Sequence, residues 1–189
     1  MRLALERRLY LAGAVAGERA LRTTSSACGM ASMLPSDQTF RIRTACPEDA
    51  AALSDLVFRA KAFWGYPKEW MEEWRDELRV TSEYVAQNRV VVAEVDHTLL
   101  AFYGLEFRAD HAYLQHLWVD PGRIGFGVGR KLLAMACGDA RKNGYRVIEL
   151  VADPNAEGFY ARQGAVRIGE IHGTVLGTAR ILPKMQLVL

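Results

Sequence analysis

The chain has 189 residues, of which 50% are hydrophobic and 24% charged, proportions that exclude a disordered, collagen-like or highly charged coiled-coil protein. Its 24 basic and 22 acidic side chains leave a net charge of +2, too small for the broad basic surface of a non-specific nucleic-acid binder. This length predicts one domain with an appendage.

The beginning of the chain differs in composition from the rest, so we predict a leader over residues 1–38 and a folded domain over residues 39–189. Arginines are spread through Ala and Leu in the leader and are followed by a Thr/Ser run. This is the composition of an organellar transit peptide, although Glu6 and Glu18 do not fit it. A start assigned too far upstream explains the segment equally well, because Met30 and Met33 directly precede the first strong fold signal.

Cysteine usage and hydrophobic run length predict the compartment. The 3 cysteines form no Cys-x-x-Cys pair and have no matching histidine spacing, so we expect reduced thiols and no bound metal. Charged residues interrupt every hydrophobic stretch before the roughly 20 apolar residues of a membrane helix are reached. We therefore predict a cytoplasmic protein with no membrane segment.

The first part of the domain predicts a strand and two helices. Residues 40–43 alternate like a strand, and Cys46-Pro47-Glu48-Asp49 is typical of a helix start, with proline and acids in the first turn. Apolar residues then recur at helical spacing from Ala51 to Ala60. A second helix is expected over residues 68–78, with Trp70, Met71 and Trp74 on one stripe.

The second part predicts a mixed α/β (α+β) arrangement. Residues 90–95, 99–107 and 112–119 are expected to form three antiparallel strands with short connections. A glycine-rich loop then leads into a helix that ends at Asn143-Gly144, and residues 145–151 form a strand, which together make a βαβ unit with a parallel pair. A short helix follows Asp153-Pro154-Asn155, and residues 165–171 and 181–189 are expected to be two closing strands.

The glycine-rich loop carries the clearest chemical signal. Gly125, Gly127 and Gly129 lie between a strand and a helix, where backbone amides and the helix dipole favour an anion such as a pyrophosphate. Arg123, Arg130 and Lys131 add positive charge nearby. A Walker loop is excluded because Gly129 is not followed by Lys-Ser or Lys-Thr, and a dinucleotide fingerprint fits poorly because the glycine spacing differs.

Two longer segments, residues 117–133 and 155–165, resemble the GCN5-related N-acetyltransferase (GNAT) superfamily in both motif and separation. The order of predicted elements from Phe40 to Leu189 is similar as well. The resemblance implies a mixed, mostly antiparallel central sheet with a splayed parallel pair, flanked by helices. It also implies acetyl-CoA as a co-substrate.

The resemblance implies roles for individual residues. The strand from Leu117 to Val119 would bind the pantetheine arm and the acetyl group through its backbone, and Tyr160 would protonate the leaving thiolate. The first loop position is usually Arg or Gln in the family but is Ile124 here, and Arg123 could replace its contact. The expected coenzyme-binding residues are Leu117, Trp118, Val119, Arg123, Ile124, Gly125, Phe126, Gly127, Val128, Gly129, Arg130, Asn155 and Tyr160.

The general base is less clearly indicated. Many relatives have a glutamate near the position of Gln115, whose amide cannot accept a proton. His116 is adjacent and titrates near neutrality, so it is the expected base, with Glu106, Glu149 or a chain of waters as alternatives. A plain structural role for a single strand histidine remains open.

The acceptor contacts are expected in the aromatic cluster between the first two helices. In the family this segment overhangs the acceptor cleft, so Trp64 and Tyr66 are the expected contacts, together with Glu106. Much of the cluster is equally explained by core packing. Aromatic rings there suit an apolar or cationic small molecule. The acidic face of the second helix is most simply a solvated surface, but it could also steer a basic acceptor.

These observations predict an N-acetyltransferase that moves an acetyl group from acetyl-CoA to a primary amine of a small molecule by direct attack. The departures at Gln115 and Ile124 leave a non-catalytic acyl-CoA binding or sensing domain as the alternative. An oxidoreductase that binds a dinucleotide in the glycine loop is a third. Homodimers are common in the family, so a second copy of the chain is a candidate partner.

Overall fold

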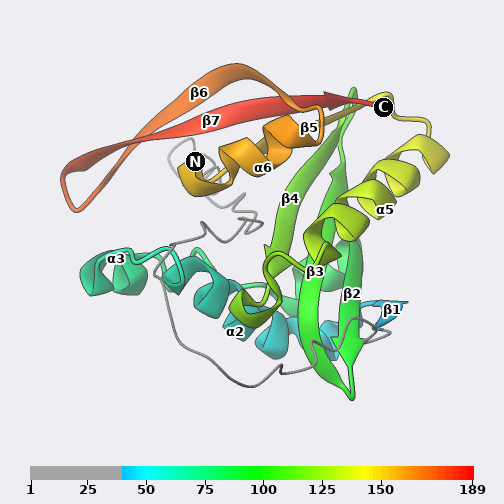
Figure 1. The fold of residues 1–189 in the computed structure, drawn as a ribbon, viewed down its shortest axis with the longest axis horizontal. Helices are drawn as coiled ribbons and strands as arrows, with labels where there is room; N and C mark the ends of the chain where they lie inside the picture. The colour runs from blue at the N-terminus through cyan, green and yellow to red at the C-terminus, as the bar shows by residue number, and fades with distance from the viewer. Residues whose placement is uncertain (1–39) are drawn as a thin grey trace, which may run out of the picture.

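A seven-stranded sheet in the order β1-β2-β3-β4-β5-β7-β6 organises the computed structural model, which describes residues 40–189 (Figure 1). The strands are β1 (Arg41–Thr44), β2 (Arg89–Val95), β3 (Thr98–Phe107), β4 (Ala112–Val119), β5 (Val147–Val151), β6 (Val166–Val175) and β7 (Thr178–Val188). All neighbours pair antiparallel except β4 and β5, which are parallel. The predicted mixed, mostly antiparallel sheet with one parallel pair is confirmed. The leader over residues 1–38 lies outside the described residues and stays a prediction.

Helices cover both faces of the sheet. They are α2 (Ala50–Ala62), α3 (Lys68–Glu73), α4 (Ser82–Gln87), α5 (Val128–Lys142) and α6 (Glu157–Arg162), with 3-10 turns at Pro47–Asp49, Pro121–Arg123 and Pro154–Ala156. One apolar core joins α5 and α6 to β3, β4 and β5, and a second joins α2, α3 and α4 to β2 and β3. No helix within residues 40–189 has the length and hydrophobicity that crossing a bilayer requires.

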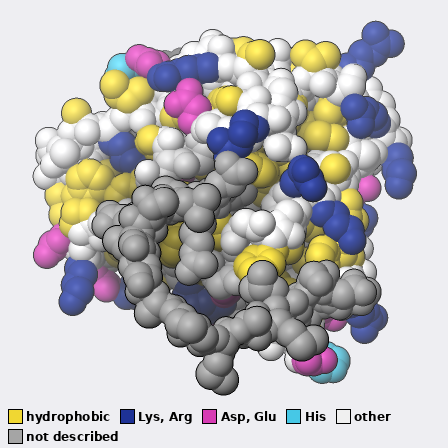
Figure 2. Space-filling view, in the orientation of Figure 1, with side chains coloured by type: hydrophobic (Ala, Val, Ile, Leu, Met, Phe, Trp, Pro, Cys, Tyr) yellow, Lys and Arg dark blue, Asp and Glu magenta, His cyan; other side chains and the backbone are white. Residues whose placement is uncertain are grey.

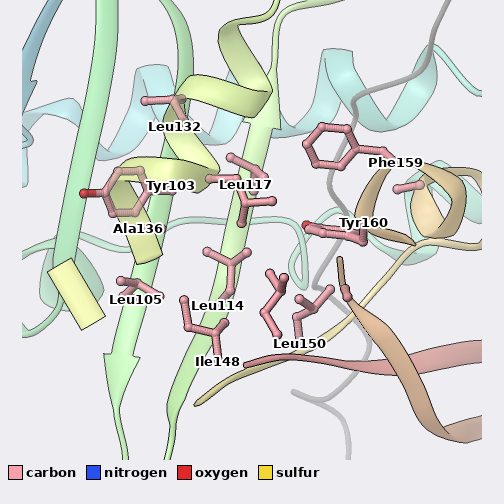
Figure 3. Packing of buried hydrophobic residues seen from close by; sticks show 14 of the residues in the cluster. Tyr103, Leu105, Leu114, Leu117, Leu132, Ala136, Ile148, Leu150, Phe159 and Tyr160 are labelled. Carbon is pink, nitrogen blue, oxygen red and sulfur yellow. The ribbon is translucent and has the colours of Figure 1, made fainter. Parts of the chain in front are cut away.

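Side chains that alternate along β3 belong to the two cores on opposite faces of the sheet. On β3, Tyr103 and Leu105 face the α5 side, whereas Phe102 packs on the α2 side. Figure 3 shows Leu105 and Tyr103 among the residues that pack beneath α5. The apolar face of α5 places Leu132 and Ala136 against them because these residues are four positions apart.

The structure differs from the sequence prediction around α3 and α4. The second helix was expected over residues 68–78 but ends at Glu73, and α4 was not expected at all. Thr81 caps α4, because its hydroxyl accepts a hydrogen bond from the Tyr84 amide at 3.0 Å. Six residues are too few for apolar periodicity to indicate a helix.

The two closing strands are longer than expected and form a hairpin that extends beyond the other strands (Figure 1). Leu176 and Gly177 connect them with φ of 47° and 79°, as a two-residue hairpin turn requires. The hairpin exposes Ile168, Leu176 and Ile181. On the face of the molecule in Figure 2, Lys and Arg side chains are spread among uncharged and apolar surface.

The most consequential irregularity is a bulge in β4. Gly104 of β3 is opposite His116, but Leu105 is opposite Leu114, which leaves Gln115 without a partner on β3. As a result Leu114 and Leu117 both face the α5 core, and Trp118 faces the α2 core. The bulge therefore shifts which side chains of β4 face each layer.

Gly104 is expected to be intolerant of a side chain. A Cβ there would lie 2.5 Å from the Tyr84 hydroxyl and 3.3 Å from Cδ2 of His116, so Gly104→Ala should lower the free energy of unfolding by about 1–3 kcal/mol through overpacking. Tyr84→Phe alone should be neutral or stabilising, because the hydroxyl is buried without a hydrogen-bond partner within residues 40–189. Urea unfolding of both single variants and the double variant measures this. Equal costs of Gly104→Ala with and without the hydroxyl would contradict the steric explanation.

Candidate functional site

The glycine loop has the conformation of an anion cradle at the start of a long helix. Gly125 and Gly127 have φ of 89° and 79°, a region that side chains other than glycine adopt with strain, and Gly127 is the N-cap of α5. The backbone N–H groups in the first turn of α5 have no intrahelical partner and can bind an anion. A Cβ at Gly125 would meet nothing within 4 Å, so backbone conformation and not space requires the glycine.

The side chains of the loop are divided between surface and core. Phe126 and Arg130 are exposed, and Arg123 is half-buried. Neither arginine forms an ion pair with any residue in the range 40–189. Val128 is buried in the α5 core, and the half-buried Ile124 packs against both cores, so both would meet a ligand through their backbones.

The edge of β4 that faces β5 is open over most of its length. The two strands pair only at Ala112 with Ile148 and at Tyr113 with Glu149. Among the strands of residues 40–189, β4 pairs only with β3 from Leu117 to Val119, and its side chains there are buried in the two cores. What this edge offers a ligand is therefore backbone N–H and C=O groups in extended geometry.

Tyr160 lies beside this open edge. Its side chain is 1% exposed, and Figure 3 shows its hydroxyl directed from α6 toward Leu117 on β4. Burial raises the pKa of Tyr160 well above its usual value, and the charge of Asp153 raises it further. The phenol is therefore protonated at neutral pH and can donate a hydrogen bond on the side of β4.

A group of polar side chains around a buried carboxylate, which we call the Asp153 cluster, lies at the end of β5. Its members are Lys61, Tyr66, Asp153, Asn155 and Arg180. They come from α2, the segment before α3, the turn after β5, and β7. The structure thus brings two expected site residues, Tyr66 and Asn155, together with three that the sequence did not indicate.

Hydrogen bonds centre the cluster on the Asp153 carboxylate. Lys61 Nζ donates to Oδ2 at 2.5 Å and Arg180 Nη2 donates to the same oxygen at 3.0 Å. The Tyr66 hydroxyl donates to Oδ1 at 2.9 Å, and Asn155 donates to Oδ1 through its backbone and side-chain nitrogens. Burial opposes ionisation of Asp153, but the Lys61 charge and these donors outweigh it and lower its pKa.

The remaining aromatic side chains pack around the cluster. The Tyr66 ring stacks on Trp70 with centroids 6.0 Å apart and meets Trp74 edge-on at 5.1 Å. Trp64 packs edge-on against Phe63, and its buried Nε1 has no hydrogen-bond partner within the described residues. Trp64 and Tyr66 therefore lie in the same segment, but only Tyr66 reaches the charged cluster.

The structure places His116 in the core on the α2 side. Its Nδ1 accepts a hydrogen bond from Trp118 Nε1 at 3.2 Å, and its ring contacts Tyr84 and Phe102. Burial lowers the pKa of His116 to about 3, so the ring is neutral at pH 7. A ring held in this way is a poor acceptor for the proton of an amine.

The neutral state of His116 predicts a pH dependence of stability. In the unfolded chain the imidazole has a pKa near 6.5, so below that pH the unfolded state binds a proton that the native state does not. The free energy of unfolding should therefore fall as pH decreases from 6.5 toward 3, by at most about 1.4 kcal/mol per pH unit from this group. Urea unfolding of the protein and of His116→Gln across this range measures the difference. Parallel curves would contradict the assignment.

Two carboxylates flank Tyr113 where β4 and β5 part. Glu106 on β3 and Glu149 on β5 are both register partners of Tyr113. Arg108 pairs with Glu106 at 2.8 Å and Lys184 pairs with Glu149 at 2.6 Å. The sequence indicated both glutamates as alternatives for the base.

A sequence signal existed for one missed residue. Lys61 is eight positions after Leu53, on the same face of α2 as Leu56, Val57 and Ala60, so its charge falls on the apolar stripe. A charge there indicates a buried partner. Nothing local indicated Arg180, which lies on a strand whose exposed and buried positions alternate irregularly.

Comparisons with known proteins agree with this geometry. The profile of the acetyltransferase (GNAT) family matches residues 50–165. No curated protein matches the chain significantly. Among solved structures, a GCN5-related N-acetyltransferase from Rhodopseudomonas palustris has a TM-score of 0.67 at 20% identity, covering 80% of this chain and 97% of that one.

Two further similar structures contain a coenzyme. PaiA N-acetyltransferase from Thermoplasma acidophilum, in complex with coenzyme A, has a TM-score of 0.62 at 21% identity, covering 80% of this chain and all of that one (100%). YncA, a putative acetyltransferase from Salmonella typhimurium with its cofactor acetyl-CoA, has a TM-score of 0.58 at 20% identity, covering 80% and 94%. At these identities the likeness establishes the fold.

Proposed function

This chain belongs to the GNAT family of acetyltransferases, and from that premise we propose that it transfers an acetyl group from acetyl-CoA to a primary amine of a small molecule. The observation that carries the proposal is the position of the Tyr160 hydroxyl beside the open edge of β4, which leads directly into the glycine loop. Coenzyme A in a similar fold supports acetyl-CoA as the donor. A cytoplasmic location and a homodimer remain predictions.

We assign the coenzyme to the surface that β4, the glycine loop and α6 form. The amides of Gly125, Gly127 and the first turn of α5 would hold the pyrophosphate, with charge from Arg123 and Arg130. The open backbone of residues 117–119 would hold the pantetheine arm. A backbone N–H of that edge would stabilise the negative charge that develops on the carbonyl oxygen during attack.

The proposed reaction needs no covalent enzyme intermediate. The amine nitrogen attacks the carbonyl carbon of the thioester, the carbon–sulfur bond breaks, and an amide forms. The departing thiolate takes the proton of Tyr160, and the surplus proton of the amine passes to a base. The burial of His116 disfavours it in this role, so we propose Glu106 or Glu149, acting through water at the parting of β4 and β5.

Ligand-dependent stability and turnover test this function. Acetyl-CoA at 100 times its Kd should raise the free energy of unfolding of the full chain by about 2.7 kcal/mol. Thiol release in the presence of a panel of small amines should then exceed hydrolysis without amine. Stabilisation without turnover on any amine would favour the acyl-CoA sensing alternative. No stabilisation of the folded protein would contradict both, and stabilisation by NAD instead would favour a dinucleotide site.

Gly127→Ala is expected to weaken coenzyme binding. Its φ of 79° is strained for alanine, so the N-cap and the amides behind it should shift, with about 1 kcal/mol lower stability and roughly a tenfold higher Kd for acetyl-CoA. Gly138→Ala in the middle of α5 is the control, because a Cβ there meets nothing within 4 Å. It should raise stability by about 0.5–1 kcal/mol without changing the Kd. Equal Kd values for both variants, measured by calorimetry, would contradict the assigned loop.

A further inference from the structure

The Asp153 cluster contains more positive than negative charge. Lys61 and Arg180 both pair with Asp153, and their side chains are 4%, 8% and 1% exposed, respectively. No second carboxylate within residues 40–189 lies within ion-pair distance of either cation. Because an unbalanced buried charge is costly, a group of this composition favours a second anion.

The hydrogen bonds of the Asp153 cluster show which side chain has N–H groups that are not bonded to the described residues. Asp153 accepts from Lys61, Arg180, Tyr66 and Asn155, which uses the capacity of a carboxylate. Arg180 donates only through Nη2, to Asp153 and to the Tyr66 hydroxyl. Its Nε and Nη1 make no hydrogen bond with the described part of the chain, although a guanidinium has five N–H donors.

Aromatic rings hold the guanidinium in place. Its central carbon lies 4.7 Å from the centroid of the Trp74 ring and 5.1 Å from that of Tyr66. A planar cation fixed in this way, with free N–H groups, is suited to binding a carboxylate in two-pronged fashion. The burial that lowers the pKa of Lys61 to about 8, with a further contribution from Arg180, agrees with a shortage of negative charge.

The position of the cluster connects it with the proposed reaction. Asp153 follows β5 at the end where β4 and β5 have parted, and Asn155 is exposed at the surface of the cluster. The charge of Asp153 also raises the pKa of Tyr160, so the cluster and the proposed acid are electrostatic neighbours. A small molecule bound at Arg180 would thus lie beside the segment that leads from Asp153 to Tyr160 on α6.

We propose that the acceptor amine also carries a carboxylate, which Arg180 binds with support from Lys61. The substrate class is thus the small amino acids in the broad sense, with the amine and the carboxylate in one molecule. This inference rests on the proposed acetyl transfer and names its acceptor. Arg180 is a specificity-determining residue, and Asp153 positions it.

Matched pairs of acceptors test the inference. The standard amino acids with a primary amine and an uncharged or basic side chain, together with β-alanine and 4-aminobutyrate, are each compared with their carboxamides, which keep the amine and remove the negative charge. For the preferred acceptor we expect kcat/KM at least tenfold above that of its carboxamide. Arg180→Gln should remove this preference by lowering kcat/KM for the acid and leaving the carboxamide within twofold, and Arg180→Lys should restore part of it. Arg79→Gln, an exposed arginine in the segment between α3 and α4, is the control and should change neither value.

A binding measurement keeps the test independent of turnover. The same acids should raise the Tm of the full chain without acetyl-CoA, and should not do so in Arg180→Gln. Carboxamides that react as well as the acids would overturn the inference and leave acetyl transfer standing. If Arg180→Gln kept the preference for the acid, the proposed role of Arg180 would be overturned. The same holds if the variant had a lower Tm but an unchanged ratio of kcat/KM between the acid and its carboxamide. If none of the acids stabilised the protein or reacted, the inference would be overturned. Stabilisation by acetyl-CoA tests the proposed function separately.

Discussion

Replacing Tyr160 with phenylalanine is expected to lower kcat about 100-fold, at the lower end of what a general acid contributes. The variant removes only the hydroxyl, which makes no hydrogen bond within residues 40–189 and is directed toward Leu117. The ring keeps its packing beside Phe159, so stability and the Kd for acetyl-CoA should change little. Burial keeps the phenol protonated, so the loss should persist across the neutral pH range. Single-turnover measurement of thiol release gives the comparison.

Tyr103→Phe is the matched control. Tyr103 is a fully buried tyrosine of the same core, and its hydroxyl donates to Asp139 at 2.7 Å. We expect the opposite result: about 1 kcal/mol lower stability from the lost hydrogen bond and an unchanged kcat. If both variants retained full activity, Tyr160 would have only a packing role and a water would have to protonate the thiolate.

Asp153→Asn is expected to lower the free energy of unfolding by about 3–5 kcal/mol, a large part of the stability of a domain of this size. The carboxylate is the only anion that pairs with Lys61 and Arg180 in the described part of the chain. Without its charge, two cations are buried together on α2 and β7. Urea unfolding at pH 7 measures the loss.

Two further variants separate charge from geometry. Glu72→Gln removes one partner of the exposed pair with Arg75 and should have no measurable effect on stability. Adding Lys61→Met to Asp153→Asn should recover part of the loss, because one buried cation is then removed. If Asp153→Asn cost no more than Glu72→Gln, the cluster would not be a buried ion pair in solution.

Local patterns in the sequence predicted most of the elements in their order, although not α4, and the glycine loop before α5. The apolar spacing of α2 and α5, the glycines at 125 and 127, and the cap at Gly144 each depend on residues a few positions apart. The same is true of the two motifs that indicated the GNAT family. Such signals are readable from one sequence because helix periodicity, turn conformation and helix capping are local properties.

The contacts between polar side chains that are distant in the sequence became known from the folded structure. Lys61 is 92 positions from Asp153, and Tyr66 is 114 positions from Arg180, so their contacts depend on where α2 and β7 pack on the sheet. The bulge at Gln115 is set by pairing with β3, and it accompanies the burial of His116 in the α2 core, where it is unsuited to act as a base. Neither the strand register nor the partner of a buried charge can be predicted from the type and spacing of side chains. The fold class and the glycine loop were therefore predictable from local sequence patterns, whereas the charged cluster depends on long-range packing.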